Sequence, residues 1–155
     1  MAHHPSISPA EQEALRTWLK LLGSSNLVRK TLQSRLNAAY GVSLSRFDVL
    51  ANLYRAPEGG VRLSDLSKQL MVSNGNVTQV MTPLVKEGYV DRTKCAQDAR
   101  AATARLTDKG KALFEEMAAD HAHWVGEIFA NLSTDDHKQV ANLLDKLDQT
   151  KLNQD

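Results

Sequence analysis

Hydrophobic positions in the first forty residues recur every three or four residues, as they do on one face of a helix. These positions are Leu15, Trp18, Leu19, Leu22, Leu32 and Leu36. The segment begins with Ser8-Pro9-Ala10-Glu11, which supplies a capping serine, a proline at the first helical position and a glutamate that bonds back to the cap. Gly41 is the residue type that usually follows a helix end. The pattern predicts one long helix over residues 9–40, preceded by a disordered tail over residues 1–8.

Three later segments share this helical spacing. Ser45 starts the first of them, Thr107 caps the second and Ser133 begins the third. Their apolar positions are, in order, Phe47, Leu50, Ala51 and Tyr54; Leu113, Phe114, Met117, His121, Trp124, Ile128 and Leu132; and Val140, Leu143, Leu144 and Leu147. The pattern therefore predicts a short helix near the middle of the chain and two helices at its end.

The most informative stretch lies between these helices. Two short helical segments, Ser64–Leu70 and Ser73–Lys86, are separated by a Met71-Val72 turn, and a short strand is predicted at Val61–Leu63. A polar hairpin from Val90 to Thr107 follows, with its tip at residues 97–100. Two helices followed by a basic two-stranded wing place one helix in a DNA major groove and a cation in the adjacent minor groove. We therefore predict a mainly α (α+β) fold with a winged helix-turn-helix DNA-binding lobe over residues 43–106.

The second of these short helices has an apolar side and a polar side. Val77, Met81 and Leu84 form the inward side. The predicted DNA-reading residues are Asn74, Asn76, Thr78 and Gln79, with Ser73 as the helix cap. Asn and Gln pair two hydrogen bonds with adenine, Thr contacts the thymine methyl, and the helix N-terminus offers N–H groups to a phosphate. The alternative is that the Ser/Asn/Gly run merely caps a surface helix.

The wing carries the second set of predicted DNA contacts. Arg100 is the residue expected to enter the minor groove, with Asp98 two positions earlier orienting it. Lys94, like Arg92 and Arg105, is expected either to contact the DNA backbone or to balance the charge of the hairpin itself. The alternative for Arg100 is a solvated surface ion pair.

The long terminal helices need a partner for their apolar sides. The central lobe needs only about 60 residues for its own core, so the helical regions 9–40 and 107–153 are left without a surface to cover. A second copy of the chain would cover them, and a two-fold dimer places two recognition helices one DNA turn apart. We predict a homodimer that reads a pseudo-palindromic site in double-stranded DNA.

Charge and composition narrow the function further. The net charge is +1, but residues 61–111 carry nine basic and five acidic side chains, whereas residues 112–155 carry three and nine. The middle of the chain is therefore the part expected to bind a polyanion, although solvated faces produce similar imbalances between basic and acidic residues. The single cysteine, Cys95, suits a reducing compartment, and no secretory signal or membrane span is visible, so we expect a cytoplasmic protein.

Sequence motifs for catalysis are missing. The chain has no Gly-rich phosphate loop, no HExxH and no cysteine pairing for zinc. His121 and His123 are two residues apart and point in different directions on a helix. We expect no enzyme activity, no catalytic residues, no metal and no cofactor.

An ordered series of motifs resembles the MarR family of winged-helix transcriptional regulators. These motifs are residues 45–50 (SRFDVL), 63–70 (LSDLSKQL), Val77-Thr78, 84–90 (LVKEGYV), 98–100 (DAR) and 106–110 (LTDKG). The resemblance covers roughly residues 10–148. It implies a dimeric, triangular α+β protein whose first and last helices form the dimer interface, with an effector pocket between that region and the DNA-binding lobes. Pro83 departs from the family, and because proline removes a helical hydrogen bond, we expect a kink near residues 79–83.

The effector is suggested by a finer resemblance. Residues 71–78, an early Trp18 and the segment 121–125 are similar to a MarR branch that responds to aromatic acids or their coenzyme A thioesters. In this interpretation Trp18, Phe47 and Trp124 line an aromatic slot and His121 bonds a phenol or carboxylate. The thioester phosphates would meet Arg29, Lys30 and Arg35. The alternatives are core or dimer packing for the aromatic residues and His121, and a solvated face for the cations.

The sequence is best interpreted as that of a repressor released by this small aromatic effector. Two other interpretations remain open. Oxidation of Cys95 in the wing would disturb DNA contacts directly, although no second cysteine resolves it. A winged helix also serves as a protein-interaction module, but such a surface is usually more aromatic and apolar than residues 74–79.

Overall fold

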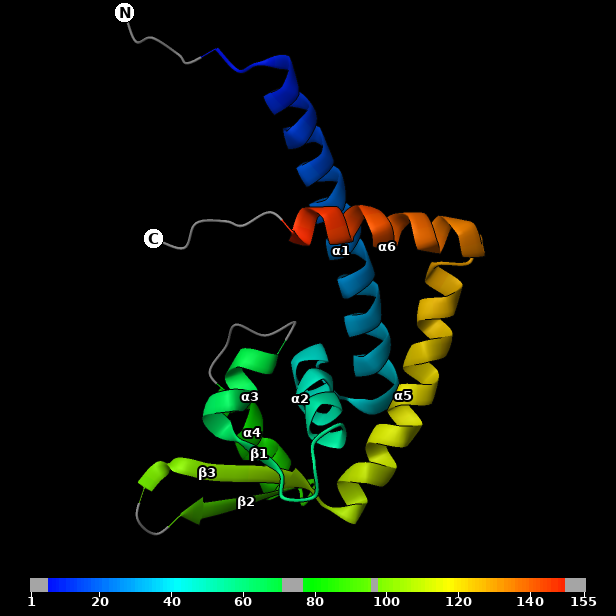
Figure 1. Ribbon diagram of the computed structural model, residues 1–155. Helices are drawn as coiled ribbons and strands as arrows, with labels where there is room; N and C mark the ends of the chain where they lie inside the picture. The colour runs from blue at the N-terminus through cyan, green and yellow to red at the C-terminus, as the bar shows by residue number, and fades with distance from the viewer. Residues whose placement is uncertain (1–5, 71–76, 96–97, 150–155) are drawn as a thin grey trace, which may run out of the picture. The chain divides into compact units, whose positions relative to one another are not determined.

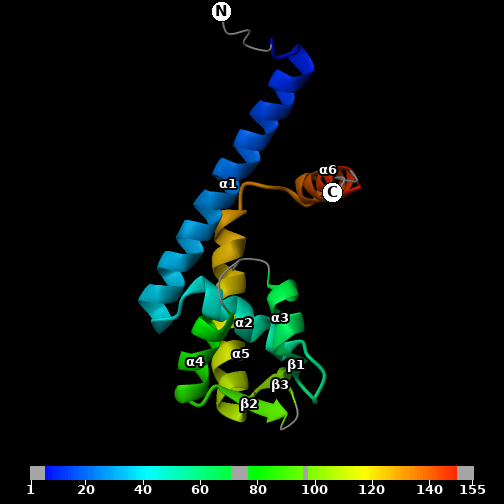
Figure 2. The same cartoon turned by 90° about the vertical axis from the view of Figure 1, so that its left-hand side faces the viewer.

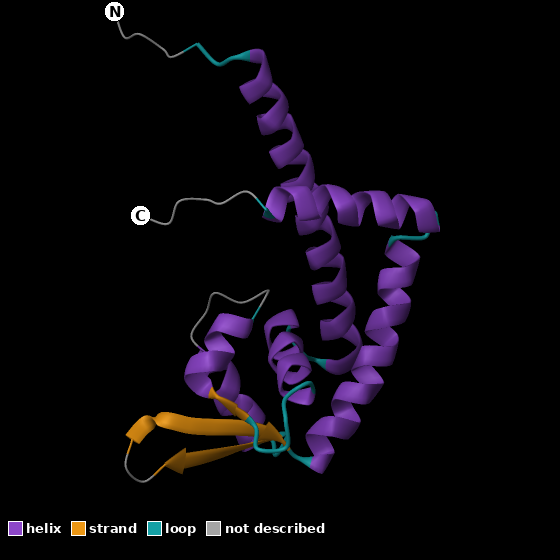
Figure 3. Ribbon diagram, in the orientation of Figure 1, coloured by secondary structure: helices purple, strands orange, loops and turns teal. Residues whose placement is uncertain are grey.

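The computed structural model describes residues 6–70, 77–95 and 98–149 (Figure 1). Its helices are α1 (Pro9–Tyr40), α2 (Leu44–Tyr54), α3 (Leu63–Gln69), α4 (Val77–Lys86), α5 (Asp108–Ile128) and α6 (Thr134–Asp148). Its strands are β1 (Val61–Arg62), β2 (Val90–Cys95) and β3 (Asp98–Leu106), which form one antiparallel sheet in the order β1-β3-β2 (Figure 3). The prediction of a mainly helical winged fold is confirmed.

Capping residues set the helix ends much as the sequence predicts. Ser8 and Glu11 form a complete capping box at the start of α1, and Gly41 ends the helix with a left-handed φ of 64°. Helix α2 begins at Leu44, one residue before the predicted Ser45, because the Ser43 hydroxyl accepts the backbone N–H of Arg46 and caps the helix there. α1 continues without a break between its two caps, so it forms a single 32-residue helix.

Helix α2 is the most deeply buried element. It contacts α1, α3, α4 and β3, and in Figure 2 it lies between α3 and α4. Its buried residues are Leu44, Phe47, Asp48, Val49, Leu50, Ala51 and Leu53. These side chains spread around most of the helix circumference, so burial extends beyond the one apolar side that the sequence predicts. We call α2, α3, α4 and the three strands the winged lobe.

The winged lobe contains one three-stranded sheet. β3 lies in the middle and pairs with β2 through Val90↔Leu106 and Arg92↔Ala104, and with β1 through Val61↔Ala104. Alternate β3 residues Ala102, Ala104 and Leu106 are buried, as expected for a strand with one covered face. The predicted two-stranded wing is therefore extended by β1, the strand predicted at Val61–Leu63. This strand ends at Arg62, and Leu63 instead starts α3.

The chain divides into two compact units, residues 1–121 and 122–155. In the first unit, large apolar side chains of α1 remain exposed outside the core: Leu15, Trp18, Leu19, Leu22 and Leu27. In the second unit, α6 has no buried residue, and Leu143 is 62% exposed. Most of the tail predicted as disordered, residues 1–8, lies outside the described residues. Among the residues that the structure describes, no helix is both long and apolar enough to cross a membrane.

Two glycines of α5 provide a matched test of the packing. A Cβ at Gly110 would overlap the Tyr89 carbonyl, whereas a Cβ at Gly126 would meet nothing within 4 Å. We expect Gly110→Ala to lower the free energy of unfolding by about 2 kcal/mol through overpacking. Gly126→Ala should raise it by up to about 1 kcal/mol, because alanine loses less entropy in a helix. Chemical denaturation measures both, and a stable Gly110→Ala variant would contradict the close approach of α5 to Tyr89.

Candidate nucleic-acid interface

Helix α4 has one face in the core and one face in solvent. Met81 and Leu84 are fully buried and Val77 is half-buried, so the predicted inward side is confirmed. Thr78 and Gln79 are exposed on the other side. The exposed face continues along the helix at Thr82, whose hydroxyl donates to the Thr78 carbonyl at 2.7 Å. The described part of α4 therefore presents a row of short polar groups on an apolar base.

Pro83 lies inside α4, and the helix continues past it to Lys86. Because proline has no N–H, the Gln79 carbonyl receives no helical bond from position 83. The chain after Pro83 re-forms its bonds, since the Glu87 N–H donates to the Pro83 carbonyl at 2.9 Å. The kink predicted at this position remains a prediction.

The wing carries an exposed pair of opposite charges. Asp91 and Arg105 face each other in the β2–β3 register, and the Arg105 Nε lies 4.0 Å from an Asp91 carboxylate oxygen. More than half of each side chain is exposed, so this pair contributes little to stability. The predicted role of Arg105 in the hairpin's own charge balance fits this contact. Arg92 points from the neighbouring position of β2 and is exposed.

Strand β3 begins earlier than the sequence predicts. The backbone pairs Cys95 with Asp98, so Asp98 and Arg100 belong to β3 rather than to the tip of the hairpin. The side chains of Lys94, Cys95, Asp98 and Arg100 lie outside the described part of the structure, as do residues Ser73, Asn74 and Asn76 entirely. Their predicted roles therefore stay predictions.

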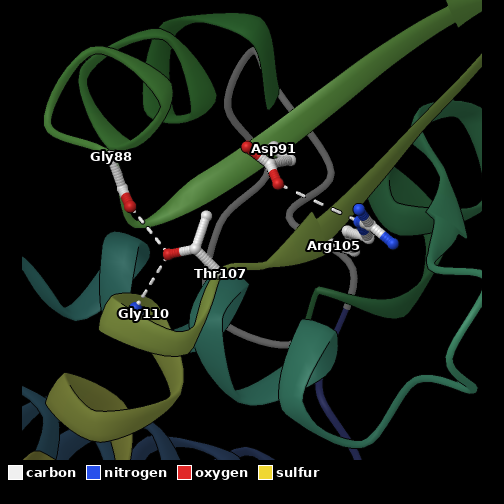
Figure 4. Close-up of polar contacts among 5 residues, drawn as sticks. All are labelled: Gly88, Asp91, Arg105, Thr107 and Gly110. Atoms are coloured by element: carbon white, nitrogen blue, oxygen red, sulfur yellow. Dashed lines mark hydrogen bonds and ion pairs between the residues drawn. The ribbon is translucent and has the colours of Figure 1, made fainter.

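The first turn of α5 holds the chain that leaves α4 (Figure 4). The Thr107 hydroxyl donates to the Gly88 carbonyl at 2.7 Å and accepts the Gly110 N–H at 3.0 Å. The Lys109 ammonium donates to the Glu87 carbonyl at 2.8 Å and lies 4.6 Å from the centre of the Tyr89 ring. The sequence predicts Thr107 as a cap but indicates no role for Lys109. In the sequence, Lys109 is marked only by lying two residues after a capping threonine, which does not reveal a partner 22 residues earlier.

Four aromatic rings meet between α2 and α5. Phe47 stacks on His121 with ring centroids 4.5 Å apart and also contacts Phe114 at 5.5 Å. Phe114 in turn lies 4.8 Å from the ring of Tyr54. Burial lowers the pKa of His121, so the neutral imidazole is favoured in the folded protein. Two of the predicted effector residues, Phe47 and His121, are thus brought together.

Two tyrosine–carboxylate bonds tie α5 to the helices beside it. The Tyr54 hydroxyl donates to Glu115 at 2.9 Å, and the Tyr40 hydroxyl donates to Asp120. The bond to Asp120 raises the pKa of Tyr40 to about 12, because the carboxylate accepts the phenolic proton and repels a phenolate. These contacts fix the rotation of α5 against the ends of α1 and α2.

The remaining predicted effector residues lie in separate places. Arg29 and Lys30 border a hollow of about 260 Å³ together with Gln33, Leu44 and Ser45, and Arg35 is half-buried on the same helix. Trp18 lies in another groove, lined by Ile7, Glu11, Ala14 and Leu15. Eleven residues of helix separate Trp18 from Arg29, about 16 Å along the axis. Trp124 belongs to the second compact unit. The first unit does not bring all the predicted effector residues together.

A further hollow of about 570 Å³ opens where α2 ends and α5 begins. It is bordered by Tyr54, Glu58, Asp91, Arg105 and Lys111, among others, so its charges are mixed. The sequence predicts no site here.

Taken together, a short buried helix, a helix with an exposed polar face and an antiparallel hairpin define a winged-helix protein. The MarR family model matches residues 42–102, which span the winged lobe up to β3. A MarR family transcriptional regulator from Silicibacter pomeroyi has a similar crystal structure, with a TM-score of 0.79 and 31% identity over 90% of this chain and 96% of that one. The chain therefore belongs to the MarR family of transcriptional regulators.

Two other proteins extend the comparison. The fold is shared with Sco3205 of Streptomyces coelicolor, a MarR family regulator solved in complex with DNA, at a TM-score of 0.77 and 22% identity over 94% of this chain and 91% of that one. The transcriptional repressor MprA of Escherichia coli is 28% identical over 136 residues, which cover 88% of this chain and 76% of MprA.

The stacked His121 makes stability depend on pH. Its pKa is lower in the folded than in the unfolded chain, so the unfolded chain takes up the proton first as the pH falls below about 6.5. The stabilising effect of the neutral ring is therefore complete above this pH and is lost as the pH falls toward the folded-state pKa. We expect His121→Phe, which keeps the stacking, to reduce the loss of stability between pH 7.5 and 5.5 in urea titrations. His123→Gln serves as the control, because His123 is exposed; an identical pH profile for wild type and His121→Phe would refute the assignment.

Proposed function

We propose that this chain is a homodimeric, sequence-specific DNA-binding repressor whose recognition helix is α4. The observation that carries the proposal is the exposed Thr78 and Gln79 on a helix whose opposite side, Met81 and Leu84, is anchored in the core. Polar groups on a rigid helix are what base reading in a major groove requires. Membership of a family of transcriptional regulators supports the same function.

In this proposal, base reading and phosphate contacts come from different residues. Gln79 pairs with an adenine edge and Thr78 contacts a thymine methyl, while Asn74, Asn76 and the cap Ser73 extend the contact toward the helix start. Arg100 enters the minor groove, with Asp98 orienting it, and Lys94 and Arg92 meet phosphates. Arg92 is exposed on β2 of the winged lobe, which is consistent with a contact to the DNA backbone.

We expect the protein to repress transcription rather than to activate it. A dimer whose two α4 helices lie one DNA turn apart covers both half-sites of an operator, which hinders access of other proteins to the same DNA. The relative MprA is named as a transcriptional repressor, which supports this expectation. The proposal places the protein in the cytoplasm, with its operator.

The proposal is tested by selecting duplexes from a random DNA pool with the purified protein. We expect enrichment of a two-fold symmetric site whose binding weakens steeply with salt. Gln79→Ala should lower affinity for the selected site by about tenfold, the loss typical of one bidentate base contact, and leave a shuffled duplex unaffected. Arg100→Ala should also weaken binding to the selected site.

Gln139→Ala is the matched control, because it removes the same side chain from an exposed position on α6. It should bind like the wild type. Failure of the wild-type protein to enrich any sequence at low salt would favour the protein-interaction alternative over DNA reading.

The dimer in this proposal rests on apolar surface that each unit leaves uncovered. On α1 the exposed residues Leu15, Leu19 and Leu22 lie along one side, and on α6 Leu143 and Leu147 are more than half exposed. Contiguous apolar surface of this kind is unfavourable on an isolated chain and is typical of homodimer interfaces. A second copy of the chain is the partner that carries matching stripes.

A charge placed in the α1 stripe should break the dimer. We expect Leu19→Glu to shift the protein to monomers in analytical ultracentrifugation and to abolish binding to the selected site. Ser24→Glu adds the same charge to the same helix, about 140° around its axis, and should remain dimeric. A dimeric Leu19→Glu protein would contradict an interface built on this stripe.

We further propose that the effector is a small aromatic acid or its coenzyme A thioester. The stack of Phe47 and His121 lies where α2 meets α5, so a ring inserted there would alter their packing. Arg29 and Lys30 border a hollow that begins at the first residues of α2, and their charges suit thioester phosphates. Binding that favours a different spacing of the two α4 helices would release the operator.

The effector proposal is tested with 4-hydroxycinnamic acid and its coenzyme A thioester. We expect at least one of them to raise the melting temperature and to lower affinity for the selected DNA. A double Arg29→Gln, Lys30→Gln variant should weaken the response to the thioester more than to the acid. Arg16→Gln with Lys20→Gln removes the same charge from α1 and should respond normally. No effect of either compound on the wild type would count against this effector class.

A further inference from the structure

The chain that leaves α4 presents three successive carbonyl groups, and the first turn of α5 donates to each of them. The Lys109 ammonium bonds the Glu87 carbonyl at 2.8 Å, and the Thr107 hydroxyl bonds the Gly88 carbonyl at 2.7 Å. The Thr107 N–H bonds the Tyr89 carbonyl at 3.1 Å. The C-terminal end of a helix carries a partial negative charge, so a cation beside it is favourable, and the two further donors hold the chain that leaves α4.

The turn between α4 and these contacts is itself well defined. Gly88 has a left-handed φ of 80°, and its N–H donates to the Val85 carbonyl at 3.1 Å. The Tyr89 N–H reaches back to the Leu84 carbonyl at 2.9 Å, which completes the paired bonds of a Schellman cap. A displacement of α5 is therefore passed to the last turn of α4 through bonded groups rather than through a loose loop.

Space on the other side of the turn is equally restricted. The Tyr89 ring lies under the Lys109 ammonium, and Gly110 lies so close to the Tyr89 carbonyl that no Cβ fits between them. We call Thr107, Lys109 and Gly110 the α4 clamp. The buried Met81 and Leu84 hold α4 by apolar contacts, which are non-directional, whereas the bonds of the clamp are directional.

We propose that Lys109 is a positioning residue for sequence reading: it orients α4 through the Glu87 carbonyl and the Tyr89 ring, without contacting DNA. This inference rests on the proposed DNA-reading function of α4. A base contact depends on the orientation of the helix that carries it, whereas phosphate contacts made by long, flexible cations tolerate small rotations. Loss of the Lys109 contacts therefore reduces discrimination between sequences more than it reduces binding to DNA in general.

The test compares Lys109→Met with Lys109→Arg and with Lys111→Met. Lys111 is an exposed lysine two residues further along α5, so its replacement removes the same charge from a different side of the helix. Affinity is measured for the duplex selected by the wild type and for a shuffled duplex of equal composition, across a range of salt concentrations. We expect Lys109→Met to lose about fivefold in affinity for the selected duplex, the effect of one exposed charged hydrogen bond. Its affinity for the shuffled duplex and its salt slope should match those of Lys111→Met, and Lys109→Arg should behave like the wild type.

Two binding outcomes overturn the proposal. An equal loss on both duplexes, with the salt slope reduced by about one relative to Lys111→Met, would make Lys109 a phosphate contact. Equal affinity of Lys109→Met and Lys111→Met for the selected duplex would make it a surface residue without a positioning role.

Hydrogen exchange of the free proteins tests the clamp without DNA. Lys109→Met should speed exchange of the Gly88 and Tyr89 amides relative to Lys111→Met, because these amides close the cap that the clamp holds. Equal exchange in the two variants refutes the clamp whatever the DNA results are. A wild-type protein without sequence preference would overturn the reading role together with the proposed function, and the exchange data would remain a separate measure of the clamp.

Discussion

The burial of α2 on almost every side is the constraint on which the winged lobe depends. Its residues contact the end of α1, both short helices and the central strand, so α2 joins most elements of the lobe to one core. Burial of this kind fixes position because a close-packed core has few alternative arrangements. α4 can expose short polar groups to a partner only because its other side is held by this core. The same packing brings Phe47 of α2 against His121 of α5.

Helix α5 adds the directional contacts that apolar packing lacks. Its first turn bonds the end of α4, and two turns later Glu115 bonds Tyr54 of α2. Asp120 bonds Tyr40 at the end of α1. One helix thus contacts the proposed reading helix, the core helix and the proposed dimer helix in succession. The proposed effector, by altering the α2–α5 packing, would act on the helix that also bonds the chain leaving α4.

Much of this arrangement is visible in the sequence, because the signals involved are local. Helix caps at Ser8 and Ser133 and the inward residues of α4 depend on neighbours three or four positions away, and they are predicted correctly. The sequence predicts the start of α2 one residue late, because Ser43 and Ser45 both suit a cap and the Ser43 hydroxyl accepts the bond from Arg46. The role of Lys109 was missed because its partner, Glu87, lies 22 residues earlier and only the folded chain brings them together. The effector residues are predicted from a resemblance and from residue type, neither of which gives distances, and helix length places Trp18 well away from Arg29 in one chain.

Because the connection between α1 and α2 is short, a tilt of the long helix α1 moves the winged lobe. Only Gly41, Val42 and Ser43 separate the two helices, and Gly41 is held in a left-handed conformation while Val42 is buried. α1 has 32 residues and is therefore about 48 Å long. A tilt of about 5° at its far end moves the lobe by about 4 Å, slightly more than the rise of one base pair. If two chains cross through their α1 helices, a small change in the crossing angle displaces each winged lobe. A change too small to disturb the packing of α1 then alters the spacing of the two lobes by about one base pair.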